Sequence, residues 1–142
     1  MYKFLIIDDE PAIRDVLKFF LEDKGFEVYL ANDGHEALSI FRDKSPEVVF
    51  LDLLLPNGKT GKDVLQEIRK LNSQTLVIII TGSSVEDTLS IIGHLNIQQI
   101  LRKPFRLEHV EKQILPKIEQ ILISRRQGLT DFPQGHSADL EL

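Results

Sequence analysis

Continuous runs of Ile, Val, Leu and Phe alternate along this chain with segments whose apolar residues recur every three or four positions. Runs such as "FLII", "VVFL" and "LVIII" lack the polar alternation of a half-exposed strand, and this is typical of parallel strands covered on both faces. Buried parallel strands require helices between them, so the alternation predicts a doubly wound α/β sheet with right-handed crossovers. The expected strands are 3–8, 26–31, 48–52, 75–81 and 97–102.

The segments between these runs have helical spacing, and residues that suit helix ends lie near their limits. Pro11 fits the first turn of the first helix, and Ser84 can cap the fourth. We expect Asn96 to close the fourth helix in a left-handed conformation. The fifth helix contains Pro116 and should bend or break there, because proline has no N–H to continue the helical hydrogen bonds.

The length of 142 residues suits one compact domain with a short extension. The hydrophobic periodicity stops at Gln127, and the remaining residues mix Gly, Pro and polar side chains. We therefore predict a single domain over 1–124. Residues 125–142 are expected to form a flexible tail, or a truncated linker to an absent module.

The composition argues against several classes of protein. The formal net charge is −5 and the charges are intermixed, whereas a nucleic-acid-binding surface needs clustered Lys and Arg. The absence of cysteine excludes disulfides and thiolate metal sites. No run approaches the roughly 18 apolar residues of a membrane span, and the opening run is too short for a signal peptide. We expect a cytoplasmic protein with no direct binding to nucleic acid or membrane.

Chemically active residues follow four of the five predicted strands. Asp8 and Asp9 follow the first strand, Asp52 ends the third, Thr81 ends the fourth, and Lys103 follows the fifth. In an open α/β sheet, ligands bind at the carboxyl ends of the strands. Three carboxylates, a hydroxyl and an ammonium group are therefore expected to converge at one edge of the sheet.

Such a cluster of carboxylates favours a bound cation. Two carboxylates about 4 Å apart repel by about 4 kcal/mol at an effective dielectric constant near 20. Oxygen ligands with open positions suit Mg²⁺ better than zinc, whose sites favour His and Cys. Lys103 and Thr81 suit a phosphoryl group beside the metal, and a carboxylate can act as the nucleophile that forms an aspartyl phosphate.

Four segments, "FLIIDDEPAIRDVL", "VVFLDLLLP", "VIIITGSS" and "LRKPF", resemble the signature blocks of response regulator receiver domains in order, strand context and separation. The resemblance covers about residues 2–122. It implies a flavodoxin-like (βα)5 sandwich whose five-stranded parallel sheet has the order 2-1-3-4-5. It also implies a switch in a two-component phosphorelay rather than a turnover enzyme.

The resemblance implies a role for each site residue. Asp52 would accept a phosphoryl group from a phosphohistidine on a sensor histidine kinase or phosphotransfer domain. Asp9 and Asp52, with the main-chain carbonyl of Leu54, would bind Mg²⁺, while Asp8 would act through water. Thr81 and the amide of Gly82 would contact the phosphoryl oxygens, and Lys103 would bind the phosphate and position the loops. The peptide bond between Lys103 and Pro104 is expected to be cis.

Phosphorylation would then change a face formed by the fourth helix, fifth strand and fifth helix, through which an effector or a second copy of the chain could bind. Ile100 stands at the switch position, three residues before Lys103, where most receivers carry Tyr, Phe or His. Isoleucine has a restricted first torsion and cannot form a side-chain hydrogen bond, so the usual aromatic rotation is unavailable. A receiver used as a constitutive, phosphate-independent docking module is therefore an alternative.

Two other classes with similar sheets fit less well. A phosphatase of the aspartyl-nucleophile class needs a second acid two residues after the nucleophile, where this chain has Leu54. Flavodoxin-like nucleotide binding needs a hydroxyl- and glycine-rich loop after the first strand, where this chain has "DDEPA". Both alternatives are disfavoured by the residues present.

Overall fold

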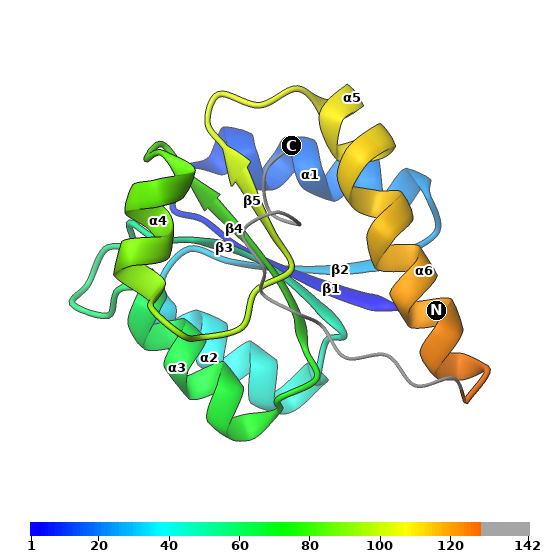
Figure 1. Cartoon of the computed structure of the whole chain (residues 1–142), viewed down its shortest axis with the longest axis horizontal. Helices are drawn as coiled ribbons and strands as arrows, with labels where there is room; N and C mark the ends of the chain where they lie inside the picture. The colour runs from blue at the N-terminus through cyan, green and yellow to red at the C-terminus, as the bar shows by residue number, and fades with distance from the viewer. Residues whose placement is uncertain (129–142) are drawn as a thin grey trace.

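The protein folds around a five-stranded parallel sheet with helices on both faces (Figure 1). The structure is a computed structural model that describes residues 1–128. The strand order is β2-β1-β3-β4-β5, so the expected doubly wound sheet and its order are confirmed. The strands are β1 (Lys3–Ile7), β2 (Glu27–Ala31), β3 (Val48–Asp52), β4 (Leu76–Thr81) and β5 (Gln99–Arg102).

The helices lie between consecutive strands and after the last one. They are α1 (Pro11–Asp23), α2 (Gly34–Lys44), α3 (Gly61–Leu71), α4 (Val85–Ile92), α5 (Leu107–His109) and α6 (Leu115–Arg126), with a π-helical turn, η1 (Val110–Ile114), between the last two. The predicted tail of 125–142 therefore begins inside α6, and its part from 129 onward lies outside the described residues.

Two hydrophobic layers hold the sheet between the helices. One layer packs α2, α3 and α4 against side chains such as Leu5, Val49 and Ile79. The other packs α1, η1 and α6 against the opposite face. Every residue of β3 and β4 is buried, which explains why these strands read as continuous apolar runs.

The helix ends follow the sequence signals with one correction. Pro11 lies in the first turn of α1, and the Ser84 hydroxyl accepts a hydrogen bond from the Asp87 amide at the start of α4. The expectation for Asn96 was wrong, because α4 ends earlier, at Gly93, which has a φ of +62°. A glycine adopts this conformation without the steric cost of a Cβ atom.

The expected disruption at Pro116 takes the form of the π-helical turn that precedes it. The Leu115 N–H donates to the carbonyl of Val110, five residues back rather than four. The turn admits one extra residue before Pro116, which has no N–H of its own to donate. The single predicted fifth helix is thus divided into α5, η1 and α6.

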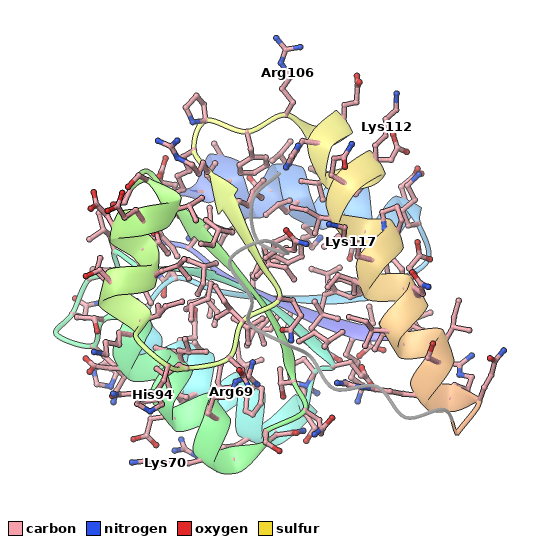
Figure 2. The ribbon with its side chains drawn as sticks, viewed as in Figure 1. Arg69, Lys70, His94, Arg106, Lys112 and Lys117 are labelled. Atoms are coloured by element: carbon pink, nitrogen blue, oxygen red, sulfur yellow. The ribbon has the colours of Figure 1, made fainter. Side chains whose placement is uncertain are left out.

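Arg69 joins three segments at the edge of the sheet opposite the strand ends (Figure 2). Its guanidinium donates to the carbonyl of Asn96 at 2.6 and 3.0 Å and to that of Thr75 at 2.7 Å. Burial, with the nearby charge of Arg125, lowers the pKa of Arg69 to about 10, so the group stays charged at neutral pH. Arg69 thus fixes the entry to β4 and the loop before β5.

An Arg69→Met variant should lose about 2 kcal/mol of unfolding free energy, because the carbonyls of Thr75 and Asn96 lose a charged donor. The neighbouring Lys70 is exposed, so Lys70→Met removes the same charge at a site where no such donor is lost. Urea unfolding of both variants tests this expectation. Equal losses in the two variants would contradict a clamping role for Arg69.

Candidate functional site at the strand ends

The carboxyl ends of the strands bring several polar side chains to one edge of the sheet. Asp8 follows β1, Asp52 ends β3, Thr81 ends β4, and Lys103 follows β5. Asp8 is completely buried, and Asp52 and Thr81 are each only 4% exposed. Carboxylates at this depth need compensation, since a buried and unpaired charge is strongly disfavoured.

Lys103 supplies that compensation by contacting three carboxylates at once. Its Nζ lies 3.0 Å from Asp8 Oδ2 and 3.1 Å from Asp52 Oδ2. A third contact, 2.7 Å long, joins it to Glu10 Oε1. The Lys103 N–H also donates to the carbonyl of Thr81 at 2.7 Å, which fixes the loop after β5 against β4.

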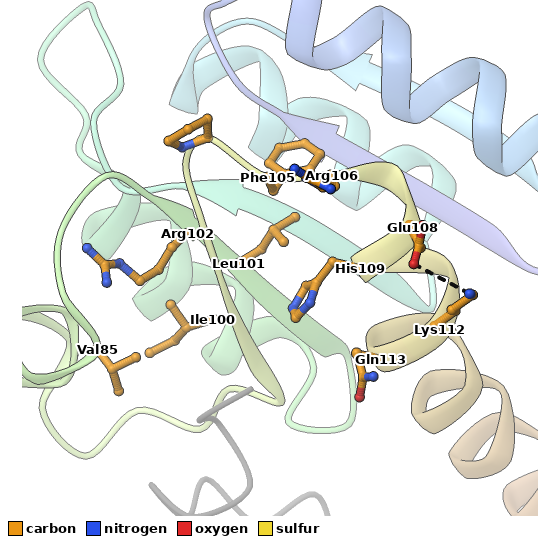
Figure 3. A pocket seen from close by; sticks show the side chains of 11 residues that line it. Val85, Ile100, Leu101, Arg102, Phe105, Arg106, Glu108, His109, Lys112 and Gln113 are labelled. Atoms are coloured by element: carbon orange, nitrogen blue, oxygen red, sulfur yellow. Dashed lines mark hydrogen bonds and ion pairs between the residues drawn. The ribbon is translucent and has the colours of Figure 1, made fainter.

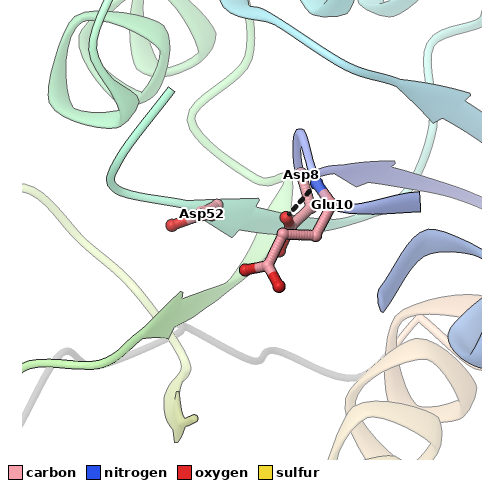
Figure 4. A group of neighbouring side chains, drawn as sticks. All are labelled: Asp8, Glu10 and Asp52. Atoms are coloured by element: carbon pink, nitrogen blue, oxygen red, sulfur yellow. Dashed lines mark hydrogen bonds between the residues drawn. The ribbon is translucent and has the colours of Figure 1, made fainter. Parts of the chain in front are cut away.

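The three carboxylates form a group that could hold a metal ion (Figure 4). One oxygen from each of Asp8, Glu10 and Asp52 lies within 4.8 Å of the others. An all-oxygen donor set of this kind, open on the side of the exposed Glu10, fits Mg²⁺. The residues present therefore fit the ion that the sequence leads us to expect.

Glu10 belongs to this group, although the sequence analysis did not single it out. Asp9, which the resemblance makes a metal ligand, is exposed and lies outside the group. The available signal was the run of three consecutive acids at 8–10. Which of them faces the site depends on the loop: the Glu10 N–H donates to Asp8 Oδ1 at 2.9 Å and turns the chain into α1.

The remaining predicted residues lie just after Asp52 in the chain or at the end of β4, the strand beside β3. The Leu54 N–H donates to Asp52 Oδ1 at 3.0 Å, while the Leu54 side chain is 81% exposed. Thr81 Oγ1 accepts from the Ser83 amide at 3.0 Å. A Cβ atom on Gly82 would meet no atom within 4 Å, so there is open space beside the site. The roles of the Leu54 carbonyl and the Gly82 amide stay predictions.

The backbone after β5 has the cis bond between Lys103 and Pro104 that the resemblance implies.

Ile100, the expected switch residue, lies in β5 and is 3% exposed. It borders a groove of about 420 Å³ on the face of α4, β5 and α5 (Figure 3). The groove is lined by Val85, Ile100, Leu101, Arg102, Pro104, Phe105, Arg106, Glu108, His109, Lys112 and Gln113.

The charges of the site perturb its two central groups. Burial raises the pKa of Asp52, and the neighbouring charge of Asp8 raises it further against the opposing effects of the Leu54 amide and Lys103. Burial lowers the pKa of Lys103, but its hydrogen bonds to Glu10, Asp8 and Asp52 outweigh this and raise it overall. Lys103 therefore remains a cation at neutral pH, and burial makes ionisation of Asp52 less favourable than it is in water.

An Asp52→Asn variant should be more stable than the wild type at neutral pH without Mg²⁺. The raised pKa of Asp52 means that its contribution to stability is present below its ordinary value of 3.8 and is lost as pH rises through the folded-state pKa. The advantage of the variant should therefore vanish below pH 3.8. Urea unfolding in EDTA at several pH values measures it.

Asp63→Asn is a control for which the expected change in stability at neutral pH is opposite to that of Asp52→Asn, because the pKa of Asp63 is lowered rather than raised. The backbone hydrogen bond from Thr60 lowers the pKa of Asp63, so its contribution to stability is present at neutral pH and is lost on acidification. This variant should be less stable than the wild type at neutral pH. A pH-independent difference for Asp52→Asn would contradict the electrostatic account of the site.

Comparison with known proteins finds one matching family and several solved structures of similar fold. Residues 4–115 match the family described as "Response regulator receiver domain". The chemotaxis response regulator CheY4 of Vibrio cholerae is 31% identical, with a TM-score of 0.72 over 83% of this chain and 98% of that one. A CheY-like receiver domain protein from Methanospirillum hungatei JF-1 is 27% identical, with a TM-score of 0.73 over 84% of this chain and 95% of that one.

A longer protein, NtrX from Brucella abortus, is 28% identical, with a TM-score of 0.78 over 89% of this chain. This chain covers only 29% of that NtrX chain, so the similarity concerns one part of a larger protein. The family match spans most of the chain, and the strand order is the one that the resemblance implies. The chain belongs to the response regulator receiver domain family.

Proposed function

We propose that this protein is a phosphorylation-dependent switch of a two-component phosphorelay and that Asp52 accepts the phosphoryl group. The observation that carries the proposal is the buried Asp52 carboxylate at a strand end, with its two oxygens held by Lys103 and the Leu54 amide. The donor would be a phosphohistidine on a sensor histidine kinase or phosphotransfer protein. We further propose a cytoplasmic location, where such a kinase domain would meet the switch.

The chemistry follows from the positions of these side chains. A carboxylate oxygen of Asp52 attacks phosphorus, the bond from phosphorus to the imidazole nitrogen breaks, and an acyl phosphate forms. Bound Mg²⁺, held by Asp8 and Asp52 with Glu10 or Asp9 beside them, would neutralise charge on the transferring group. Lys103 and the Thr81 hydroxyl lie at the same strand ends, where they would contact the transferred phosphoryl oxygens together with the Gly82 amide. The chain is thus an acceptor rather than a turnover enzyme.

The groove beside Ile100 is the surface that we propose for the output. Its floor is apolar, with Val85, Ile100 and Phe105, and Arg102 and Arg106 add positive charge. Lys112 is paired with Glu108 at 3.4 Å across an exposed edge (Figure 3). An effector or a second copy of this chain would bind on this face, which β5 connects directly to Lys103.

Beryllofluoride, which mimics the phosphoryl group, tests this coupling. With Mg²⁺ present, it should shift the NMR signals of Ile100 and His109 in wild type and leave them unchanged in Asp52→Ala. Partner affinity, or the self-association of the chain, should change in parallel. If beryllofluoride binds at Asp52 but the groove and its partners do not respond, the chain is better described as a phosphate-independent docking module, which the buried isoleucine at the switch position would favour.

Two further expectations concern surfaces that the protein would not use. Within the described part of the chain, no helix is both long enough and apolar enough to cross a membrane. The net negative charge opposes attraction to nucleic acid. We therefore propose that this chain contacts protein partners and does not itself bind DNA or RNA.

A further inference from the structure

The shortest contact of Lys103 is not with the proposed phosphate acceptor. Its Nζ lies 2.7 Å from Glu10 Oε1, against 3.0 Å from Asp8 Oδ2 and 3.1 Å from Asp52 Oδ2. The Glu10 side chain is 56% exposed, whereas those of Asp8 and Asp52 are 0% and 6% exposed. Lys103 therefore lies between two buried carboxylates and one carboxylate at the rim.

Asp8, Glu10 and Lys103 form a closed ring of interactions. One oxygen of Asp8 accepts from the Glu10 N–H at 2.9 Å, and its other oxygen contacts Lys103, which in turn contacts the Glu10 carboxylate. Arg14 strengthens the same loop by donating from Nη1 to the Asp8 carbonyl at 2.6 Å. The position of the Glu10 side chain is thus fixed relative to the buried oxygens.

Lys103 and a divalent cation compete for the same oxygens. The ammonium lies within 3.1 Å of one oxygen on both Asp8 and Asp52, so a cation bound there would face a like charge at short range. Three carboxylates and one ammonium leave two excess negative charges, which matches one divalent cation. The cation and Lys103 can both remain in the site if Lys103 no longer contacts the buried carboxylates of Asp8 and Asp52.

We propose that Glu10 is a positioning residue that retains Lys103 at the rim when Mg²⁺ occupies the buried carboxylates. Glu10 is one of three partners of Lys103 without the cation and its main partner with the cation. Removing the Glu10 carboxylate therefore weakens the cation-bound state more than the cation-free state. This inference rests on the proposed function, because it assumes that Mg²⁺ binds at Asp8 and Asp52.

The competing explanation is that Glu10 ligates the metal directly, since its oxygen lies within 4.8 Å of the other two. The two roles differ in their dependence on Lys103. A direct ligand is needed whether or not Lys103 is present, whereas a positioning residue acts through Lys103. A double-mutant cycle with Lys103→Met separates them.

The experiment uses the full chain and MgCl₂ titrations followed by ¹H–¹⁵N NMR. Glu10→Gln should weaken Mg²⁺ binding about tenfold, which corresponds to about 1.4 kcal/mol. In the Lys103→Met background, Glu10→Gln should weaken Mg²⁺ binding by a factor that is smaller than in the wild-type background by about threefold or more. In wild type with saturating Mg²⁺, the ¹⁵Nζ signal of Lys103 should remain that of a hydrogen-bonded ammonium, and Glu10→Gln should lose this signature.

Asp15→Asn is the matched control, because Asp15 is an exposed acid on α1 and no ion pair or hydrogen bond joins it to the site. It removes the same charge and should change Mg²⁺ affinity less than twofold. Equal weakening by Glu10→Gln in both backgrounds would overturn the positioning role and make Glu10 a ligand. Failure of the wild type to bind Mg²⁺ would instead overturn the proposed function, and this inference with it.

Discussion

An Asp52→Ala variant is expected to lose labelling by acetyl phosphate in Mg²⁺ by at least about a hundredfold, because the nucleophile itself is removed. The two oxygens of Asp52 are separately held, one by the Leu54 amide and the other by Lys103. Asp8 is completely buried, and its oxygens are occupied by the Glu10 amide and Lys103. Asp8 is thus held in the same way as Asp52, and the two differ in access: Asp52 is 4% exposed, whereas Asp8 is 0% exposed.

The labelling is measured by intact-mass spectrometry, and the fold of the variant is checked by circular dichroism. Asp15→Ala removes an exposed carboxylate on α1 and should label like the wild type. A variant without Asp52 that is labelled at the normal rate would contradict the assignment. Labelling that is slowed by only a few-fold would indicate a positioning role for Asp52 instead.

A Gly61→Ala variant is expected to lose about 3 kcal/mol of unfolding free energy or more, because overpacking against rigid backbone leaves little room to relax. Gly61 begins α3 directly against the end of β3, and its N–H donates to the Leu53 carbonyl at 3.1 Å. A Cβ atom at Gly61 would overlap the carbonyl oxygen of Asp52 and the Cα of Leu53. These are backbone atoms, so α3 or the acceptor strand would have to move.

Gly82→Ala provides the control, since a Cβ atom there meets nothing within 4 Å. This variant should stay within about 0.5 kcal/mol of the wild type. Urea unfolding midpoints with a common slope give both values. A Gly61→Ala protein as stable as the wild type would mean that α3 can move away from β3 at no cost, contrary to the close packing described for this junction.

The fold could be predicted because burial on both faces leaves a direct trace in the sequence. Every residue of β3 and β4 is buried, and these are the runs "VVFLD" and "LVIIIT". The predicted ends of the strands were less accurate where a residue is buried but is not hydrogen-bonded to the neighbouring strand. Ile97 is 1% exposed and was expected to begin the last strand, but β5 begins at Gln99. An apolar pattern records burial, not the hydrogen bonds that define a strand.

Two helix features show the limit of local signals. Asn96 and Gly93 both suit a left-handed helix end, and the choice between them depends on how α4 packs against the sheet. The structure ends α4 at Gly93, with Ile92 as its last buried residue. Pro116 predicted a break, but not that the chain would accommodate it as a π-helical turn, because that depends on packing of the turn against the sheet.

The position of the strands along the chain predicted which strand ends form the candidate site. It did not predict which acidic side chain after β1 points into the site. Asp8, Asp52 and Lys103 come together because parallel strands end at the same edge. Glu10 was missed because the direction of each acid after β1 depends on the backbone of the loop, which the hydrogen bond from Glu10 to Asp8 determines. The exposed position of Asp9 has the same origin.

The position of the covalent phosphate tests the central claim most directly. The wild-type protein is phosphorylated with acetyl phosphate and Mg²⁺, the acyl phosphate is reduced with borohydride to convert the modified aspartate into homoserine, and the peptides are sequenced by mass spectrometry. The account predicts homoserine at residue 52 and nowhere else. Homoserine at residue 8 or 9, or phosphate on a histidine with residue 52 unmodified, would contradict it.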